Sequence, residues 1–284
     1  YSNSEISKWI GYIPENEPIG IMFSGGIDSG AVFLTTYHVM KKLGLNLARL
    51  KAFTLSVDGG GNDVKQARDF MSHLDMELFH EIIEVPANWI DLETAVKIIE
   101  DYKPLDIQAG AMTLALCRGI REIYDDFTYL IDGDGGDENL KDYPIEENPE
   151  LTIKSVLSNQ MLYQEGWGVD AIKHSLTFSG GLSRGCTRGY APLRRYNFRG
   201  FSPFMLPSVI QIAEGIPFIE LTDWNHEKLY ALKGEIISKG IQSTTGMHMP
   251  VFEKCRFQDG AANQRVFGDE PSQYRKAFHA TFDC

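Results

Sequence analysis

Apolar residues follow two different spacings in the first half of this sequence. Up to about residue 143, short continuous apolar runs alternate with longer segments in which apolar residues recur every three to four positions. The short runs are typical of strands buried on both faces, and the longer segments are typical of helices. The predicted strands are 19–23, 50–56, 78–85 and 128–131, and the predicted helices are 29–43, 62–75, 87–101 and 108–124. This alternation predicts an α/β fold with a doubly wound parallel sheet.

The two ends of the chain have a different character. Residues 1–17 predict a short amphipathic helix that ends at Pro14. After about residue 148 the strand pattern fades, and helical segments near 149–165, 203–215 and 225–239 surround a Gly- and Arg-rich loop at 179–200. We therefore expect an N-terminal helix (1–17), an α/β core (18–148) and a C-terminal helical region (149–284). We expect that region to pack on the same core rather than form an independent domain.

Composition and charge exclude several classes of protein. With 43% hydrophobic and 23% charged residues, the composition is that of an ordinary globular protein. The net charge of −12 counts against a nucleic-acid partner, because such partners are bound by basic surfaces. No apolar run has the length of a membrane span, and the N-terminal residues are too polar for a signal peptide. The four cysteines form no CxxC pair, so we expect neither zinc nor dithiol chemistry, and a reduced cytoplasmic setting.

Residues 24–29 read Ser-Gly-Gly-Ile-Asp-Ser and lie between a predicted strand and a predicted helix. Two glycines let the backbone approach a phosphate, and a helix N-terminus favours negative charge there. Asp28 adds a carboxylate that can hold magnesium. No Gly-Lys-Ser/Thr follows, so the pattern is not a Walker loop. It resembles the SGGxDS loop of the ATP pyrophosphatases, which cleave ATP between the α and β phosphates.

A glycine-rich turn without a ligand is the alternative interpretation of such a loop. The sequence contains its own comparison, because residues 178–181 repeat Phe-Ser-Gly-Gly. That copy has no Asp and leads to Arg184 rather than to an apolar helix. We interpret the second copy as an ordinary loop and the first as a nucleotide site.

A second polar cluster follows the last predicted strand of the sheet. Residues 132–138 read Asp-Gly-Asp-Gly-Gly-Asp-Glu, and four clustered carboxylates are costly unless a cation lies among them. A solvated turn remains an alternative, whereas the EF-hand spacing of a calcium loop is not met. If strands 19–23 and 128–131 are neighbours, Asp28 and Asp137 face each other at the sheet edge. They can then share a magnesium ion that neutralises a leaving pyrophosphate.

Taken together, these motifs resemble the synthetase domain of asparagine synthetase and its relative β-lactam synthetase. That family reads SGGxDS and then GxGSDE at about this separation. Residues 202–204 (Ser-Pro-Phe) resemble its Arg-x-Pro-Phe-Leu helix, and residues 254–260 resemble its Lys-x-x-Phe-x-Asp-Gly segment. The motifs occur in family order over roughly residues 18 to 262.

The resemblance implies a fold of the adenine nucleotide α-hydrolase-like class and an activity. The family activates a carboxylate with ATP and Mg²⁺ to give an acyl-adenylate and pyrophosphate, and an amine then forms the amide. The implied nucleotide contacts are Phe23, Ser24, Gly25, Gly26, Asp28, Ser29, Leu55 through its backbone, Gly133 and Asp134. Asp28 and Asp137 would bind magnesium. Lys254 would stabilise negative charge on the reacting oxygens.

The sequence departs from the family pattern in three places. It shows no upstream glutaminase domain with an N-terminal cysteine nucleophile, so we expect no glutaminase activity. Ammonia would come from solution or from a separate partner, or another amine would react. Gly136 replaces the usual Ser, and residues 140–143 replace a Gly-rich continuation. Arg199 stands where relatives often carry a Glu, and it cannot act as a base. Tyr196 or Tyr190 is then the candidate base, or Arg199 binds an anionic substrate.

Five arginines lie in or beside the 179–200 loop, and they have two interpretations. They either pair with surface acids, or they recognise a substrate carboxylate or phosphate. The arginines are Arg184, Arg188, Arg194, Arg195 and Arg199.

Our favoured hypothesis is an ATP-dependent, AMP-forming amide ligase that acts on a small carboxylate and an amine. A sulfur-transfer enzyme of the same PP-loop superfamily is an alternative, although such enzymes commonly use paired cysteines. A non-catalytic nucleotide-binding module is a second alternative, and it would need neither Asp137 nor Lys254. The sequence leaves open whether the protein forms a homo-oligomer.

Overall fold

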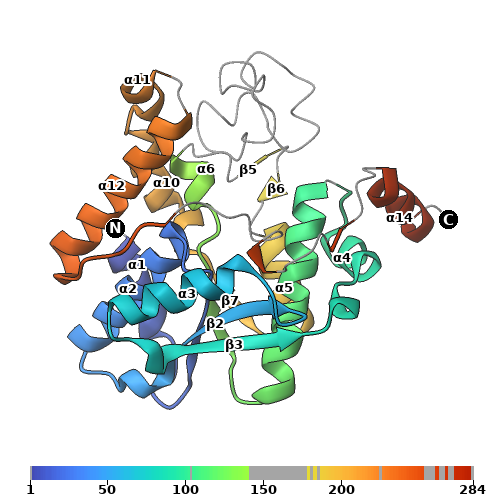
Figure 1. The fold of residues 1–284 in the computed structure, drawn as a ribbon, viewed down its shortest axis with the longest axis horizontal. Coiled ribbons are helices and arrows are strands. Elements are labelled where there is room, and N and C mark those ends of the chain that lie inside the picture. Colours follow the sequence, from blue (N-terminus) through green and yellow to red (C-terminus); the bar gives the residue numbers. More distant parts are fainter. Residues whose placement is uncertain are drawn as a thin grey trace.

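Five parallel strands form the central sheet, in the order β3-β2-β1-β4-β7 (Figure 1). The computed structural model describes residues 2–102, 104–140, 178–179, 182–183, 186–223, 226–252, 260–261, 266–267 and 272–282. The strands are β1 (Ile19–Met22), β2 (Leu50–Val57), β3 (His80–Val85), β4 (Tyr129–Ile131) and β7 (Arg199–Phe201). Every strand pair is parallel. The predicted α/β class is confirmed.

The helices of the first half match the predicted segments closely. They are α1 (Ser2–Gly11), α2 (Ile27–Lys42), α3 (Asn62–His73), α4 (Leu92–Ile99) and α5 (Pro104–Ile123). One predicted helix, 87–101, is interrupted near its start. A 3₁₀ turn (Ala87–Trp89) comes first, and Asp91 then caps α4 by accepting a hydrogen bond from the Thr94 N–H at 3.0 Å. An Asp that bonds the first turn in this way begins a new helix.

Helices also dominate the described part of the second half. They are α6 (Gly136–Leu140), α9 (Ala191–Arg195), α10 (Pro207–Glu214), α11 (Phe218–Thr222), α12 (His226–Thr245) and α14 (Ser272–Phe282). The predicted helix 149–165 lies outside the described residues. None of the helices described by the structure is long and apolar enough to cross a lipid bilayer.

One strand of the sheet comes from the region that the sequence predicts to be helical. β7 pairs with β4, and the Arg199 N–H donates to the Thr128 carbonyl at 2.7 Å. β7 reads Arg-Gly-Phe and is not a continuous apolar run like the Tyr-Leu-Ile of β4, so the hydrophobic pattern did not reveal it. The second Ser-Gly-Gly copy also has a structure of its own. β5 (Phe178–Ser179) pairs antiparallel with β6 (Leu182–Ser183), so this copy does not lead from a strand into a helix.

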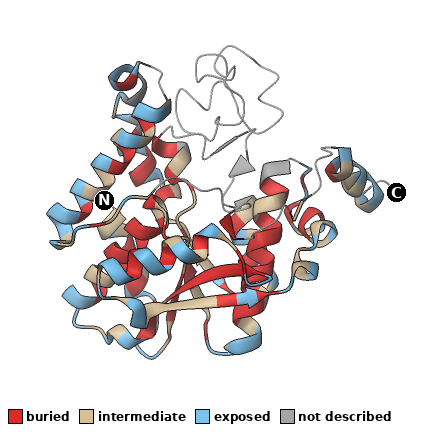
Figure 2. Cartoon of the chain, viewed as in Figure 1, coloured by how far each residue is buried: buried red, intermediate tan, exposed pale blue. Residues whose placement is uncertain are grey.

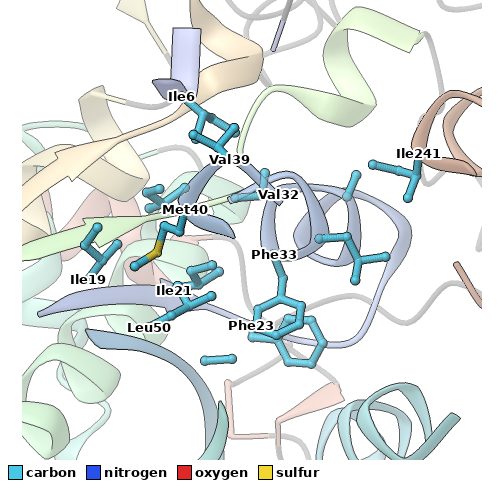
Figure 3. Close-up of a cluster of buried hydrophobic side chains, with 14 of the residues drawn as sticks. Ile6, Ile19, Ile21, Phe23, Val32, Phe33, Val39, Met40, Leu50 and Ile241 are labelled. Atoms are coloured by element: carbon cyan, nitrogen blue, oxygen red, sulfur yellow. The ribbon is translucent and has the colours of Figure 1, made fainter. Parts of the chain in front are cut away.

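Two apolar layers cover the two faces of the sheet, since strand side chains alternate between faces. On one face Ile19, Ile21 and Leu50 pack against α1 and α2 (Figure 3). On the other face Phe53 and Leu55 pack against residues of α5 and α9. Buried residues accordingly concentrate in the sheet and in the helices that pack on it (Figure 2). The chain is therefore doubly wound, as predicted.

Replacing a core residue of β1 tests this layered packing. Ile21 is fully buried, and Ile21→Ala should lower the free energy of unfolding by about 2–5 kcal/mol, because apolar contact is lost and a cavity remains. Urea unfolding followed by circular dichroism measures the change. Leu78 is 95% exposed, so the matched control Leu78→Ala should change stability by less than about 0.5 kcal/mol. Equal losses in the two variants would contradict this description of the core.

Candidate active site

The two polar clusters of the sequence meet at one edge of the sheet. β1 and β4 are parallel neighbours, with Ile21 opposite Ile131. The segments that follow them, residues 23–29 and 132–138, therefore emerge side by side. In open parallel sheets ligands bind outside the carboxyl ends of the strands, which is where these segments lie.

Residues 24–29 form a tight turn that ends in the first turn of α2. The hydroxyl oxygens of Ser24 and Ser29 lie 3.2 Å apart, and the Ser24 N–H donates to the Ser29 hydroxyl at 3.3 Å. Gly26 is the N-cap of α2 and supplies no side-chain cap. The N–H groups of a first helical turn have no partner within their helix, and the helix dipole adds positive potential. This turn is thus built to receive an anion.

A buried lysine holds the two clusters together. The Lys233 ammonium, on α12, lies 2.7 Å from Asp28 Oδ2 and also bonds Asp137 Oδ1. Lys233 is only 1% exposed, although both carboxylates are partly open to solvent. The structure therefore brings Asp28 and Asp137 to the same point, across the edge that the sequence indicated. A single ammonium compensates two acids that would otherwise repel each other.

Glycines permit the close approach of the two clusters. A Cβ atom added at Gly136 would lie 2.3 Å from Asp28 Cγ, and one at Gly133 would lie 2.9 Å from the Ser29 nitrogen. A side chain at position 136 would thus displace the carboxylate of Asp28.

Sequence reasoning missed Lys233, although the sequence holds a signal for it. Leu229, Lys233, Ile237 and Ile241 follow one another at spacings of four, which places them on one face of α12. Leu229 and Ile241 are buried. A lysine in the apolar stripe of a helix is rarely buried without a partner. That interruption of the stripe indicates an acidic partner elsewhere in the fold.

The acid pair at this edge suits a magnesium ion. Mg²⁺ prefers oxygen ligands and commonly takes one or two carboxylates, with waters and substrate phosphates completing its shell. Among the residues that the structure describes, no group of three or more His, Cys, Asp or Glu side chains could hold a metal. Asp28 and Asp137 would be the two protein ligands of such a magnesium ion.

Asp132 and Asp134, which flank Gly133 in the sequence, form a second acidic pair. Asp132 is buried, and its Oδ1 accepts a hydrogen bond from the Asp134 N–H at 3.0 Å, whereas its Oδ2 has no hydrogen-bond partner in the described structure. Burial, aided by the negative charge of Asp134, raises the pKa of Asp132 to about 7. Arg188 donates from Nε to Asp134 Oδ2 at 3.3 Å. This arginine therefore faces the site.

Three other arginines of the 179–200 loop contact tyrosine rings. Arg194, Arg195 and Arg199 are exposed. They lie over the rings of Tyr190, Tyr196 and Tyr129, respectively. Arg184 lies outside the described residues. Of the arginines of the 179–200 loop that the structure describes, Arg188 pairs with acids of the protein, Asp134 and Asp106, and recognition of a substrate stays a prediction.

The predicted contact of Leu55 with a nucleotide would involve its backbone, because its side chain is buried in the core. The Phe53 carbonyl accepts a hydrogen bond from the Phe23 N–H at 2.8 Å, at the end of β1. Because the backbone polar groups of a strand alternate between its two sides, those of Leu55 point the same way as those of Phe53. They lie beyond the last paired residue of β1, above the turn at 24–29.

Three predicted site residues make their described contacts in the sheet or the core rather than with the two loops. Arg199 and Tyr196 were expected to act in catalysis, but Arg199 is paired with Tyr129 at the amino end of β4. Tyr196 comes three residues earlier, and burial raises the pKa of its hydroxyl, which makes it a poorer base. Parallel strands put their amino ends at the opposite edge from the loops at 24–29 and 132–138, so this placement does not support the catalytic roles expected for Arg199 and Tyr196, which stay predictions.

Phe23 is the third of these residues. Its ring packs in the core against Phe33 and Phe70. Its N–H and carbonyl bond within the sheet, to Phe53 and Thr54. Phe23 therefore has a structural role at the base of the turn, and its expected nucleotide contact stays a prediction. Lys254 lies outside the described residues.

Two comparisons with known proteins bear on this site. A family model described as Asparagine synthase matches residues 14–182, which is more than half of the chain. The match contains both loops, 24–29 and 132–138, but not Lys233. A search of curated proteins finds no match.

Replacing Lys233 should destabilise the protein, and added Mg²⁺ should restore part of the lost stability. Lys233→Met should lower the free energy of unfolding by about 3 kcal/mol, because two facing carboxylates lose their cation. Excess Mg²⁺ should restore part of the loss, since the ion can take the place of the ammonium. Urea unfolding with and without Mg²⁺ measures both effects.

A matched control lies on the same helix. Lys239 is exposed and pairs with Glu235 one turn away, so Lys239→Met should leave stability nearly unchanged with or without Mg²⁺. A Lys233→Met protein that is as stable as wild type, or whose free energy of unfolding does not change with Mg²⁺, would contradict the proposed arrangement.

Asp132 should make stability depend on pH. Between pH of about 4 and about 7 the folded protein keeps a proton that the unfolded chain has released, because the pKa of Asp132 is raised to about 7. Stability should fall as pH rises through this window, by at most about 1.4 kcal/mol per pH unit, and the penalty should persist above it. Asp132→Asn should flatten this part of the profile and be the more stable protein at about pH 8. Urea unfolding across the window measures this, and exposed Asp126→Asn should keep the wild-type slope.

Proposed function

This chain belongs to the asparagine synthase family, a family of ATP-dependent carbon–nitrogen ligases, and on that premise we propose that it is an AMP-forming amide ligase. It would adenylate a small carboxylate, release pyrophosphate and pass the acyl group to an amine or to ammonia. The observation that carries the proposal is the convergence of Asp28 and Asp137 on Lys233, beside the N-terminus of α2.

The residues at the end of β1 would bind the phosphates of ATP. The hydroxyls of Ser24 and Ser29, the backbone of Gly25 and Gly26 and the first turn of α2 offer donors to a pyrophosphate. Lys233 places a positive charge next to the same position. Mg²⁺ held by Asp28 and Asp137 would supply further neutralisation of the leaving pyrophosphate.

Adenine recognition is assigned to the backbone of β2. The polar backbone groups of Leu55 lie on the side of β1, beyond the last paired residue of that strand. Backbone groups can read the edge of a base without any particular side chain. In this proposal the base would lie along β2 and the phosphates at residues 24–29.

We propose that the acidic pair Asp132 and Asp134 accepts a proton from the attacking amine. Amines are ammonium ions near neutral pH, and they must lose a proton before they attack. A buried acid with a pKa of about 7 can accept such a proton. Gly133 separates this pair from the phosphate end of the site. With Arg199 and Tyr196 at the opposite edge of the sheet, Asp132 and Asp134 take over the role of proton acceptor. Lys254 keeps its proposed role of stabilising charge on the reacting oxygens.

The geometry does not favour the two alternative functions. Cys117 is buried, and burial raises the pKa of its thiol far above the usual range, which is opposite to what sulfur transfer requires. A module that only binds nucleotide would have no use for a second acid opposite Asp28.

Pyrophosphate release across a panel of carboxylic acids, with and without ammonia or amino acids, tests the proposal. Release that depends on a particular acid is the expected result. Asp28→Asn and Asp137→Asn should each lower the rate by at least about 100-fold, because charge on the pyrophosphate is no longer compensated. Lys254→Ala should lose turnover yet still bind ATP.

Asp69→Asn, at an exposed position of α3, is the matched control and should keep full activity. The absence of release with any acid, or release without one, would refute the ligase. Full activity in the Asp137→Asn protein would remove the proposed role of the acid pair.

A further inference from the structure

The Thr54 hydroxyl links the segment after β1 to the start of β3. Thr54 lies in β2 and is 1% exposed, and its Oγ1 lies 2.6 Å from the Phe23 carbonyl oxygen and 2.8 Å from His80 Nε2. A carbonyl oxygen can only accept, so the hydroxyl donates its one proton to Phe23. The Thr54 oxygen must then accept a hydrogen bond from His80 Nε2–H. The geometry therefore fixes the tautomer of His80 as well as the direction of both hydrogen bonds.

The surroundings of His80 agree with this assignment. Its ring packs edge-on against the ring of Phe23, with the two centroids 5.9 Å apart. Burial, aided by the positive charge of Arg68, lowers the pKa of His80 to about 4. The imidazole is consequently neutral near pH 7 and has a single N–H, which it donates to Thr54.

The Phe23 carbonyl would have another partner in a regular sheet. The Phe23 N–H donates to the Phe53 carbonyl at 2.8 Å, and in a regular parallel ladder the Phe23 carbonyl would accept from the N–H of Leu55. The paired register instead ends at Met22, opposite Phe53. No hydrogen bond joins Leu55 to Phe23 within the described part of the chain. The Thr54 hydroxyl has thus taken the place of the Leu55 N–H.

This exchange of partners leaves the Leu55 N–H without its ladder acceptor. Leu55 is 1% exposed, and a buried backbone N–H is costly unless protein, water or a ligand accepts its hydrogen bond. The residue lies toward the carboxyl end of its strand, and ligands of open parallel sheets bind at those ends. A ligand with a hydrogen-bond acceptor at this point would complete the pairing.

We propose that Thr54, oriented by His80, is a positioning residue for the nucleotide: by binding the Phe23 carbonyl it keeps the Leu55 N–H free to donate to the base of ATP. The inference rests on the proposed function, which assigns the base to the backbone of Leu55. Ring nitrogens of adenine accept hydrogen bonds, as this role requires. Thr54 and His80 act without touching the nucleotide. Their effect should fall on the binding of the base and spare the binding of the phosphates at residues 24–29.

Hydrogen exchange of single backbone amides, followed by NMR, tests the hydrogen bonds without any ligand. In the wild-type protein the Leu55 amide should exchange at least about tenfold faster than that of Phe53, which is paired in the ladder. Thr54→Val keeps the shape of the side chain and removes the hydroxyl. The Phe23 carbonyl should then accept from the Leu55 N–H, and exchange of this amide should slow by at least about tenfold. Thr54→Ser retains the hydroxyl and should match wild type.

Calorimetric binding measurements test the consequence for the nucleotide. Thr54→Val should weaken ATP binding by about tenfold, which corresponds to the loss of one hydrogen bond. The affinity for inorganic tripolyphosphate should change by less than about twofold, because this probe has no base. Thr113→Val is the matched control: its buried hydroxyl donates to the Ala109 carbonyl at 3.0 Å within α5, and its loss should leave ATP affinity at the wild-type value.

A double-mutant cycle tests whether His80 acts through Thr54. His80→Phe keeps a ring beside Phe23 and removes the N–H donor, so ATP binding should weaken by about threefold. His80→Phe combined with Thr54→Val should bind ATP no more weakly than Thr54→Val alone, because the histidine has no effect without the hydroxyl. Additive losses in the double variant would contradict this role of His80.

Three outcomes would overturn the inference. One is a Leu55 amide that exchanges at the same rate in Thr54→Val as in wild type. Another is a Thr54→Ser protein that behaves like Thr54→Val. The third is a loss of tripolyphosphate affinity equal to the loss of ATP affinity, which would indicate general damage to the site. If Thr54→Val does not fold, the wild-type comparison of Leu55 with Phe53 decides alone. If ATP binds but no acid supports pyrophosphate release, the ligase fails while the exchange rates and affinities still decide on this inference.

Discussion

The ammonium of Lys233, placed between Asp28 and Asp137, is the interaction on which the site depends. A parallel sheet collects the segments after β1 and β4 at one edge, and each segment brings carboxylates with it. Without a cation these acids would repel each other in a partly dry environment. Lys233 compensates them from a helix in the second half of the chain, and that helix must therefore be docked for the edge to keep its shape. The geometry of the proposed phosphate site therefore depends on residues from both halves of the sequence.

Much of the fold could be predicted because the first half obeys simple periodicities. The strands at 19–23 and 50–56 are continuous apolar runs, and the helices that follow them have clear apolar faces. β7 was not foreseen, since its Arg-Gly-Phe sequence is not an apolar run like that of β4, which is equally short. The helix 87–101 was predicted in one piece because Asp91 was not recognised as a cap. These errors concern local backbone geometry, which the hydrophobic pattern does not record.

The site could be predicted less completely than the fold. The loops at 24–29 and 132–138 could be found because glycines and acids directly after buried strands are costly without a ligand. Arg199 and Tyr196 were expected near these loops from motif spacing, and spacing does not say at which end of a strand a residue lies. Lys233 was missed because its only sequence signal is an interruption of the apolar stripe of α12, which does not identify its partners. Its acidic partners are far away in sequence, and only the folded chain shows the pairing.

The bond between Lys233 and Asp28 joins residues that are 205 positions apart in the sequence. Contacts of such separation form late, because the chain must first close a very long loop. During synthesis the first strands emerge from the ribosome well before α12 does. Until α12 arrives, the two acids lack their cation, and the nascent chain has no finished site. The site should therefore be incomplete in a newly made molecule until α12 has been translated and has packed against α2.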